Sequence, residues 1–268
     1  MHDDTATIGV IGGSGLYRLL EGARVVDVDT PYGPPSDPVV VGEVGGRRVA
    51  FLPRHGTDHR LPPHRIPYRA NLWALRSLGV RQVLASCAVG SLVPTLGPGS
   101  LVICDQLVDR TSGRVQTFYD RGAVHVPFAD PYCPRGRRVA VDLAVAAGWA
   151  VEDGGTMVVV EGPRFSTRAE SLAYAAAGWS VVNMTGHPEA VLARELALCF
   201  TPLALVTDLD AGVQDGAGVT QAEVFDVFRE HTARLRSLLL EVVTALPDDQ
   251  DCACARALDG LHPDPALP

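Results

Sequence analysis

MVVVEGPRFSTRAESLAYAAAGWSVVNMTGHPEAVLARELALCFTPLALVTDLD, residues 157–210, is the stretch of the sequence that decides the fold. Short apolar runs typical of β-strands alternate along it with segments that have helical spacing. We predict strands at 157–160, 179–182 and 203–206, with helices at 167–177 and 189–198. This order of elements predicts a sheet whose strands are joined by helices.

Polar side chains gather where these predicted strands end. In open α/β sheets, ligands bind in the crevice outside the carboxyl ends of the strands. We therefore expect one pocket to be lined by Arg164, Ser166, Asn183, Met184, Thr185, Asp208 and Asp210.

Asp208 and Asp210 are two residues apart, so in a strand they point to the same face. A carboxyl group beside another carboxylate in an apolar pocket has a raised pKa and can act as an acid. The alternative is an exposed polar turn, TDLDAG, that follows a buried strand.

The rest of the chain extends the same pattern on both sides. We predict strands at 7–11, 39–44, 48–52, 82–88 and 101–108, and helices at 68–78, 137–146 and 221–246. The fold class is therefore α/β, with a single domain in which helices flank a central mixed sheet. We place this domain at residues 1–246. Residues 247–268 form a C-terminal tail whose composition is typical of a poorly ordered segment.

Composition and charge exclude several classes of function. The net charge is -8 and the pI is about 5.4, so the backbone of DNA or RNA is not an expected partner. All 23 residues counted as Lys or Arg are arginine, which excludes a Schiff-base lysine and a phosphate-binding lysine of the Walker type. No apolar segment is long enough to span a membrane, and the acidic N-terminus is unlike a signal peptide, so we expect a cytoplasmic protein.

Two short motifs early in the chain could bind an anion. The turn GGSG at 12–15 follows the first strand, where backbone N–H groups can hold phosphate; a tight turn without a ligand is the alternative. Arg54 and His55 follow the strand at 48–52, and Arg supplies a rigid fork of donors; a solvated loop cation is the alternative. A metal site is not predicted at His55, His59 and His64. Gly and Pro residues between them break any helix that would place the three on one face.

The six cysteines do not indicate a metal site either. Four lie in or near apolar strands and are interpreted as small core residues: Cys87, Cys104, Cys133 and Cys199. Cys252 and Cys254 form a CAC motif, which is a weak signal because a metal would need further ligands at suitable spacing.

Eight motifs in order carry a resemblance to a known family: GGSG, PRHG, YRANLWAL, CAVGSL, DQLVDRTSGR, EGPRFSTRAES, NMTGHPEAVLA and TDLD. Together, over Ile8 to Leu246, the sequence resembles the trimeric purine nucleoside phosphorylases, and within them the 5′-methylthioadenosine phosphorylases. The resemblance implies cleavage of a nucleoside by phosphate in a homotrimer, with no metal and no organic cofactor. The implied partners are a small nucleoside and phosphate, with no nucleic acid and no membrane.

The resemblance also implies roles for individual residues. The implied phosphate site is Ser14, Arg54, His55, Cys87, Ala88 and Thr185. The implied catalytic residues are Asp208 and Asp210. The implied substrate site is Phe165, Ser166, Asn183, Met184, Gln221, Val224 and Phe225, with His125 reaching in from the neighbouring subunit. Two positions depart from the family pattern: Cys87 stands where Thr is frequent, and Gln221 replaces an apolar residue.

The purine preference follows from two positions. Family members that act on 6-oxopurines carry Glu at position 166 and Asn at 208, whereas this chain has Ser166 and Asp208. A carboxylate accepts from the 6-amino group of adenine, and a protonated carboxyl can donate to N7. We therefore expect phosphorolysis of 5′-methylthioadenosine to adenine and 5-methylthioribose 1-phosphate. A 6-oxopurine or methylthioinosine phosphorylase, a non-catalytic nucleoside-binding protein and a hydrolytic nucleosidase are the alternatives.

Overall fold

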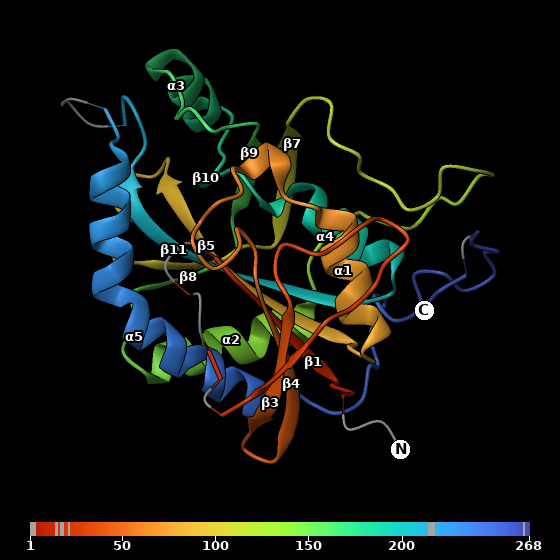
Figure 1. The fold of residues 1–268 in the computed structure, drawn as a ribbon. Helices are drawn as coiled ribbons and strands as arrows, with labels where there is room; N and C mark the ends of the chain where they lie inside the picture. The colour runs from red at the N-terminus through yellow and green to blue at the C-terminus, as the bar shows by residue number, and fades with distance from the viewer. Residues whose placement is uncertain (1–3, 14–15, 17–18, 21, 214–217, 265) are drawn as a thin grey trace.

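A computed structural model describes residues 4–13, 16, 19–20, 22–213, 218–264 and 266–268. Within these residues, helices cover both faces of a central mixed sheet (Figure 1), as the sequence predicts. The strands are β1 (Ile8–Gly12), β2 (Arg24–Val26), β3 (Val39–Val44), β4 (Arg47–Pro53), β5 (Gln82–Ser91), β6 (Leu101–Ile103), β7 (Gln106–Arg110), β8 (Val151–Asp153), β9 (Thr156–Val160), β10 (Val181–Asn183) and β11 (Cys199–Leu209). The α-helices are α1 (Tyr68–Ser77), α2 (Pro134–Ala146), α3 (Arg168–Ala176), α4 (Gly186–Glu195) and α5 (Gln221–Ala245), and a short 3-10 helix covers Pro63–Arg65.

The sheet branches at β5, which contacts three other strands. β1 and β11 both pair with β5 in parallel, and β10 pairs with its last residues in antiparallel orientation. One path of paired strands runs β2-β3-β4-β1-β5-β10-β9-β7, while β11 leads from β5 to β6 and then β8. The carboxyl ends of β5 and β11 therefore lie side by side, and the short strand β10 runs antiparallel beside the last residues of β5.

Side chains alternate between two cores along the central strands. On β11, Leu203 and Leu205 pack with α2 and α5, whereas Ala204 and Val206 face the core that includes α1 and α4. This alternation is the period of two expected of a strand buried on both faces. The long helix α5 begins at a capping box, in which the Thr220 hydroxyl accepts a hydrogen bond from the N–H of Glu223.

One predicted strand is two strands in the structure. We predicted a single strand at 101–108, but β6 pairs with β11 and β8 while β7 pairs with β9. The chain changes partners at Cys104 and Asp105, where the Asp105 carboxylate accepts a hydrogen bond from the N–H of Gly155 at 2.9 Å. A short apolar run is consistent with a buried strand, but it does not show with which strand the segment pairs.

The C-terminal segment 247–268 lies against the domain in its described residues. It has turns but no helix or strand, and Cys252, Cys254 and Ala257 are buried. Gln250 Nε2 donates to the backbone carbonyl of Arg81 at 2.7 Å, which ties the segment to the chain just before β5. The division at residue 246 stays a prediction.

Among the helices that the structure describes, none is long and apolar enough to cross a lipid bilayer.

Candidate active site

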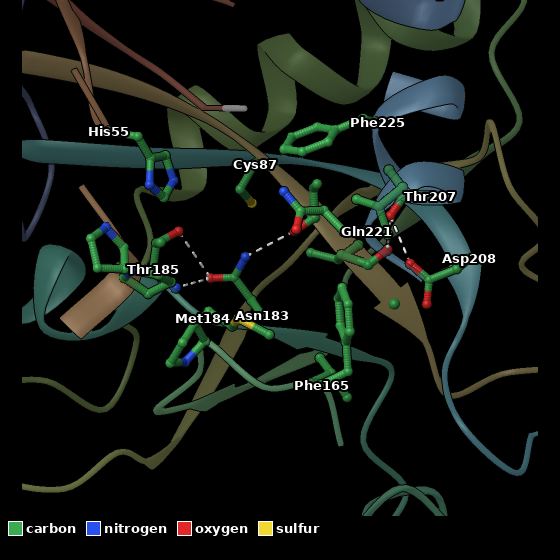
Figure 2. A pocket seen from close by; sticks show the side chains of 18 of the residues that line it. His55, Cys87, Phe165, Asn183, Met184, Thr185, Thr207, Asp208, Gln221 and Phe225 are labelled. Atoms are coloured by element: carbon green, nitrogen blue, oxygen red, sulfur yellow. Dashed lines mark hydrogen bonds between the residues drawn. The ribbon is translucent and has the colours of Figure 1, made fainter. Parts of the chain in front are cut away.

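A cavity of about 340 Å³ lies where β5, β10 and β11 end. The loop after β4, the loop before α3 and the first turns of α5 complete its wall. Most of the predicted site residues line it: Arg54, His55, Cys87, Ala88, Phe165, Ser166, Asn183, Met184, Thr185, Asp208, Asp210, Gln221, Val224 and Phe225. Figure 2 shows His55 and Thr185 on one side of this cavity and Asp208 on the other.

The two predicted catalytic carboxyl groups converge above one glycine. A Cβ at Gly90 would lie 2.9 Å from Asp208 Oδ1 and 3.4 Å from Asp210 Oδ1, so a side chain there would displace them. The pairing of β11 with β5 shifts register between Val206 and Asp208. Such bulges re-aim side chains beside active sites, and here the shift falls at the catalytic pair.

The two carboxyl groups have different surroundings. Burial raises the pKa of Asp208 to about 6, despite the hydrogen bond that its Oδ2 accepts from Thr207 at 2.8 Å. The Asp210 carboxylate accepts a hydrogen bond from the Ser171 hydroxyl at 2.7 Å and is buried. Asp208 is therefore suited to hold and donate a proton, while Asp210 is fixed by α3.

The Ser166 hydroxyl is left without a hydrogen-bond partner. Its oxygen is buried and lines the same cavity. A buried polar atom without a partner costs free energy unless a ligand or water satisfies it. The position of this hydroxyl fits a contact to a polar ligand.

The opposite side of the cavity is built around a buried arginine. Arg54 Nε and Nη2 donate to the two oxygens of Glu189 at 2.8 and 2.9 Å, and Nη1 donates to the carbonyl of Ser86 at 2.8 Å. Both charged side chains are 1% exposed. A guanidinium has five N–H donors, so two remain for an anion in the cavity. Glu189 thereby fixes the orientation of Arg54, a role that its place in a helix did not reveal.

The glycine-rich turn packs directly against this arginine. A Cβ at Gly13 would lie 2.5 Å from the Ser86 carbonyl oxygen and 3.1 Å from Arg54 Nη1, so only glycine fits. The N–H of Gly13 donates to the Ser86 hydroxyl at 3.1 Å, so this N–H is already engaged within the protein. Ser14, predicted as a phosphate ligand, lies outside the described residues.

His55 is held as a neutral imidazole. Burial, the Arg54 charge and His59 lower its pKa to about 3, although the hydrogen bond with Leu61 opposes the shift. Nδ1 lies 2.8 Å from the Leu61 carbonyl oxygen, which can only accept, so Nδ1 carries the hydrogen. Nε2 is then an acceptor, suited to the O–H of a monoprotonated phosphate.

Asn183 organises the residues between these two sides. Its Oδ1 accepts from the backbone N–H groups of Thr185 and Gly186 at 2.7 and 2.6 Å, and its Nδ2 donates to the Ala88 carbonyl at 3.0 Å. Asn183 therefore links the end of β5 to the start of α4 (Figure 2). The Thr185 hydroxyl, which lines the cavity, lies 3.3 Å from the same Oδ1.

Arg114 supports this loop from outside the cavity. Its Nη1 donates to the carbonyls of Met184 and His187 at 2.9 and 2.6 Å. The residue lies in a segment without helix or strand, and no local pattern in the sequence pointed to this contact.

Cys87 lies in the cavity wall as a thiol. Burial raises its pKa to about 12, despite the nearby Arg54 charge. Since the thiolate is the nucleophile, Cys87 is not suited to covalent catalysis.

One part of the wall is apolar. Phe165, Met184, Val224 and Phe225 line it, and the Phe225 ring packs edge-on against His59 at 5.5 Å between centroids. Gln221 contributes the only amide from α5 among the described lining residues. His59 was not predicted as part of the pocket.

Two predicted residues lie outside the cavity of their own chain. Arg164 is exposed and donates to both oxygens of Glu170 at 2.8 and 2.7 Å, so the prediction that it lines the pocket is wrong. The capping box that begins α3 holds Glu170 in place for this pair. His125 is exposed in the segment between β7 and α2, and a contribution to a neighbouring subunit stays a prediction.

Comparisons with known proteins find relatives that match almost the whole chain. The family model described as the phosphorylase superfamily matches residues 7–244. A purine nucleoside phosphorylase of Streptomyces coelicolor is 60% identical over 98% of this chain and 98% of that protein. An S-methyl-5′-thioadenosine phosphorylase of Mycolicibacterium smegmatis is 57% identical over 95% of this chain and 97% of its own. The solved methylthioadenosine phosphorylase of Schistosoma mansoni, in complex with adenine, has a TM-score of 0.89 at 37% identity and covers 94% of this chain and 96% of that one.

Proposed function

We propose that this chain, which belongs to the phosphorylase superfamily, cleaves 5′-methylthioadenosine with phosphate. The products are adenine and 5-methylthioribose 1-phosphate. The chain's membership of this superfamily confirms the resemblance inferred from the motifs. The observation that carries the proposal is the two-sided cavity, with anion donors on one side and Asp208, whose pKa is raised to about 6, on the other.

The reaction breaks the bond between the purine N9 and the anomeric carbon. A phosphate oxygen forms the new bond to this carbon as the sugar passes through a cationic state, as in glycoside cleavage. The Asp208 carboxyl donates its proton to N7, so the purine leaves neutral. Phosphate enters as HPO₄²⁻, and its O–H proton is lost as the ester forms. Asp208, which has given its proton to N7, takes up one proton through solvent, so the products are neutral adenine and the dianionic sugar 1-phosphate. The neutral Nε2 of His55 is suited to accept a hydrogen bond from the phosphate O–H.

The phosphate site uses few charges. Arg54 supplies the cationic donors, and its pairing with Glu189 orients the guanidinium while reducing its net attraction for an anion. The Thr185 hydroxyl, which donates to Asn183 Oδ1 at 3.3 Å, adds a neutral donor when it turns toward phosphate. A site with so little net charge suits a phosphate that binds and is consumed in each turnover. It does not suit a phosphate that stays bound.

Adenine is the base that the polar groups fit. Asp208 can donate to N7, and Asp210 with the unpartnered Ser166 hydroxyl leaves acceptors for an exocyclic amino group. A 6-oxo group would face the acceptor oxygens of Asp210 and could pair there only with the Ser166 hydroxyl, which can also donate. The apolar wall of Phe165, Val224 and Phe225 fits a methylthio group, although the Gln221 amide also leaves room for a 5′-hydroxyl.

The second candidate is a purine nucleoside phosphorylase, the name that the Streptomyces coelicolor relative carries. We take 5′-hydroxyl nucleosides such as adenosine as the substrates of this candidate. A panel of methylthioadenosine, methylthioinosine and adenosine at saturating phosphate tests the proposal. We expect the highest kcat/KM for methylthioadenosine, with adenosine next and methylthioinosine last. A higher value for methylthioinosine would contradict the assignment of the base site.

We further propose that the protein works in the cytoplasm as a homotrimer, with nucleoside and phosphate as its partners and no cofactor in catalysis. His125 is exposed and absent from its own cavity, which is what a residue that completes a neighbour's site requires. Activity should then fall on dilution in step with dissociation measured by light scattering. A fully active monomer would contradict the trimer.

A further inference from the structure

Four buried cysteines meet at the other end of β11 from the cavity. Cys133 precedes α2, Cys199 is the first residue of β11, and Cys252 and Cys254 belong to the C-terminal segment. All four are at most 6% exposed, and they form a cluster of their own. β11 is 11 residues long, which at about 3.3 Å per residue separates this cluster from Asp208 by roughly 30 Å.

The four sulfur atoms are arranged like the ligands of one metal ion. All of them lie within 4.8 Å of one another, and Sγ of Cys199 and Cys252 are 3.2 Å apart. A tetrahedral ion with bonds of about 2.3 Å to sulfur holds its ligands about 3.8 Å apart. The structure has all four as free cysteines. Small side-chain rotations would therefore bring them to the geometry of a single ion.

Hydrogen-bond donors surround the sulfur atoms. Cys133 is the N-cap residue of α2, at the end of the helix where backbone N–H groups have no partner within the helix. The guanidinium of Arg194, itself 4% exposed, lies 3.7 Å from Cys254 Sγ. Gln250 Nε2 is 3.7 Å from Cys199 Sγ. Donors and a helix N-terminus stabilise thiolates, so these surroundings suit a group with negative charge.

We propose that Cys133, Cys199, Cys252 and Cys254 bind one zinc ion as a closed four-thiolate site. Four sulfur ligands in tetrahedral array select zinc among the common divalent ions. Since the protein supplies all four ligands, the ion has no open position and is structural. The complex of four thiolates with one zinc ion is anionic, and the buried Arg194 guanidinium offsets that charge.

The site fastens the C-terminal segment to the domain. Cys252 and Cys254 come from residues after α5, whereas Cys133 and Cys199 begin two elements of the core. The side chain of Arg135 adds an ion pair with Asp249 on the same segment. If zinc binds the folded chain and not the unfolded chain, it stabilises the folded chain by mass action.

The proposal is tested on the full-length protein, produced with zinc in the medium and purified under reducing conditions without chelator. Elemental analysis should find about one zinc per chain, the stoichiometry of a closed structural site. The double variant Cys252→Ala with Cys254→Ala should hold zinc only at background. The matched control is Cys104→Ala, which removes a buried cysteine outside the cluster and should keep the zinc.

A second measurement needs no variant, so the test survives if the double variant fails to fold. Cobalt added to the metal-free, reduced wild-type protein should produce thiolate-to-cobalt charge-transfer bands and the visible bands of a tetrahedral site. Removing zinc with a chelator should lower the melting temperature. A reduced protein that takes up neither zinc nor cobalt overturns the proposal, as does mass spectrometry that finds these cysteines joined in disulfides under the same conditions.

Discussion

The two ends of β11 hold reactive side chains in opposite states. At the carboxyl end, Asp208 has its pKa raised to about 6 and the nearby Ser166 hydroxyl has no partner. At the amino end, four thiols face one another and are surrounded by donors from α2, Arg194 and Gln250. The comparison teaches that unsatisfied polar groups around a cavity fit a ligand that comes and goes. A closed set of ligands fits an ion that stays.

Changing the acid at the open end should have the largest effect. Asp208→Asn keeps a similar shape but cannot give up a proton, so kcat for methylthioadenosine should fall by about 10²–10⁴-fold, the usual cost of losing a general acid. In the wild type, kcat should fall as pH rises through about 6, because the protonated form of Asp208 is then lost. An Asn variant with wild-type kcat would remove Asp208 from catalysis.

The same variant should be more stable at neutral pH. The pKa of Asp208 in the folded chain, about 6, lies above its ordinary value of 3.8, so the folded state binds the proton more tightly. That contribution to stability is complete below pH 3.8 and is lost as pH rises through about 6. At pH 8, Asp208→Asn should therefore raise the free energy of unfolding by at most about 3 kcal/mol. Equal urea midpoints at pH 8 would show that burial does not raise this pKa.

Removing the cation from the open end should act on phosphate. Arg54→Ala loses charge-assisted hydrogen bonds worth about 1.5–3 kcal/mol, so the KM for phosphate should rise by roughly 10–150-fold while that for methylthioadenosine changes little. The single variant also leaves the Glu189 charge buried and unpaired, which costs about 3–5 kcal/mol of stability.

A second variant separates these two effects of the arginine. Arg54→Ala with Glu189→Gln removes both charges of this buried pair. The stability should therefore recover, while the KM for phosphate stays high. Steady-state kinetics and urea unfolding on both variants provide the measurement. A phosphate KM that recovers together with stability would show that Arg54 acts only on the fold.

The base site should respond to a paired change. Asp208→Asn with Ser166→Glu places an amide where O6 can accept and a carboxylate where N1–H can donate. The ratio of kcat/KM for methylthioadenosine to that for methylthioinosine should fall by about tenfold, the effect of one buried hydrogen bond of ~1.4 kcal/mol. A ratio that does not move toward methylthioinosine would refute the proposed contacts to the purine.

The smallest effect on catalysis should come from the closed end. The Cys254→Ser substitution is made roughly 30 Å from Asp208, about the length of β11. At temperatures where the variant and the wild type are both folded, kcat and the two KM values should therefore be equal in the two proteins. The melting temperature of the variant should be lower, because a ligand of the proposed ion is lost. A large loss of kcat in a folded Cys254→Ser variant would show that the two ends are coupled.

The sequence predicted much of the open end, because its residues follow strands. Asp208 and Asp210 come just after the apolar run at 203–206, and Arg54 and His55 come just after the strand at 48–52. The topology of an α/β sheet brings such strand ends together. The roles of Glu189 and Arg114 could not be predicted from the sequence. Both residues contact parts of the chain that are distant in sequence, and the neighbouring residues do not indicate these contacts. The prediction for Arg164 was wrong because its side chain pairs with Glu170, which lies outside the cavity.

The closed end could not be predicted from spacing. Cys133, Cys199 and the CAC motif are separated by 66 and 53 residues or more, and each cysteine alone looks like a small core residue. The cysteine ligands of common zinc sites occur in pairs with two to four residues between them, and no two cysteines of this chain have that spacing. The site exists only because β11 begins beside the start of α2 and the C-terminal segment returns to the same place.

The requirement for phosphate tests the central claim most directly. Methylthioadenosine is incubated with the purified protein in phosphate and in a phosphate-free buffer of equal ionic strength, and adenine and sugar phosphate are quantified. The account predicts that adenine appears only with phosphate, in equal amounts with 5-methylthioribose 1-phosphate. Equal release of adenine in both buffers, with free methylthioribose as the second product, would contradict it and identify a hydrolase.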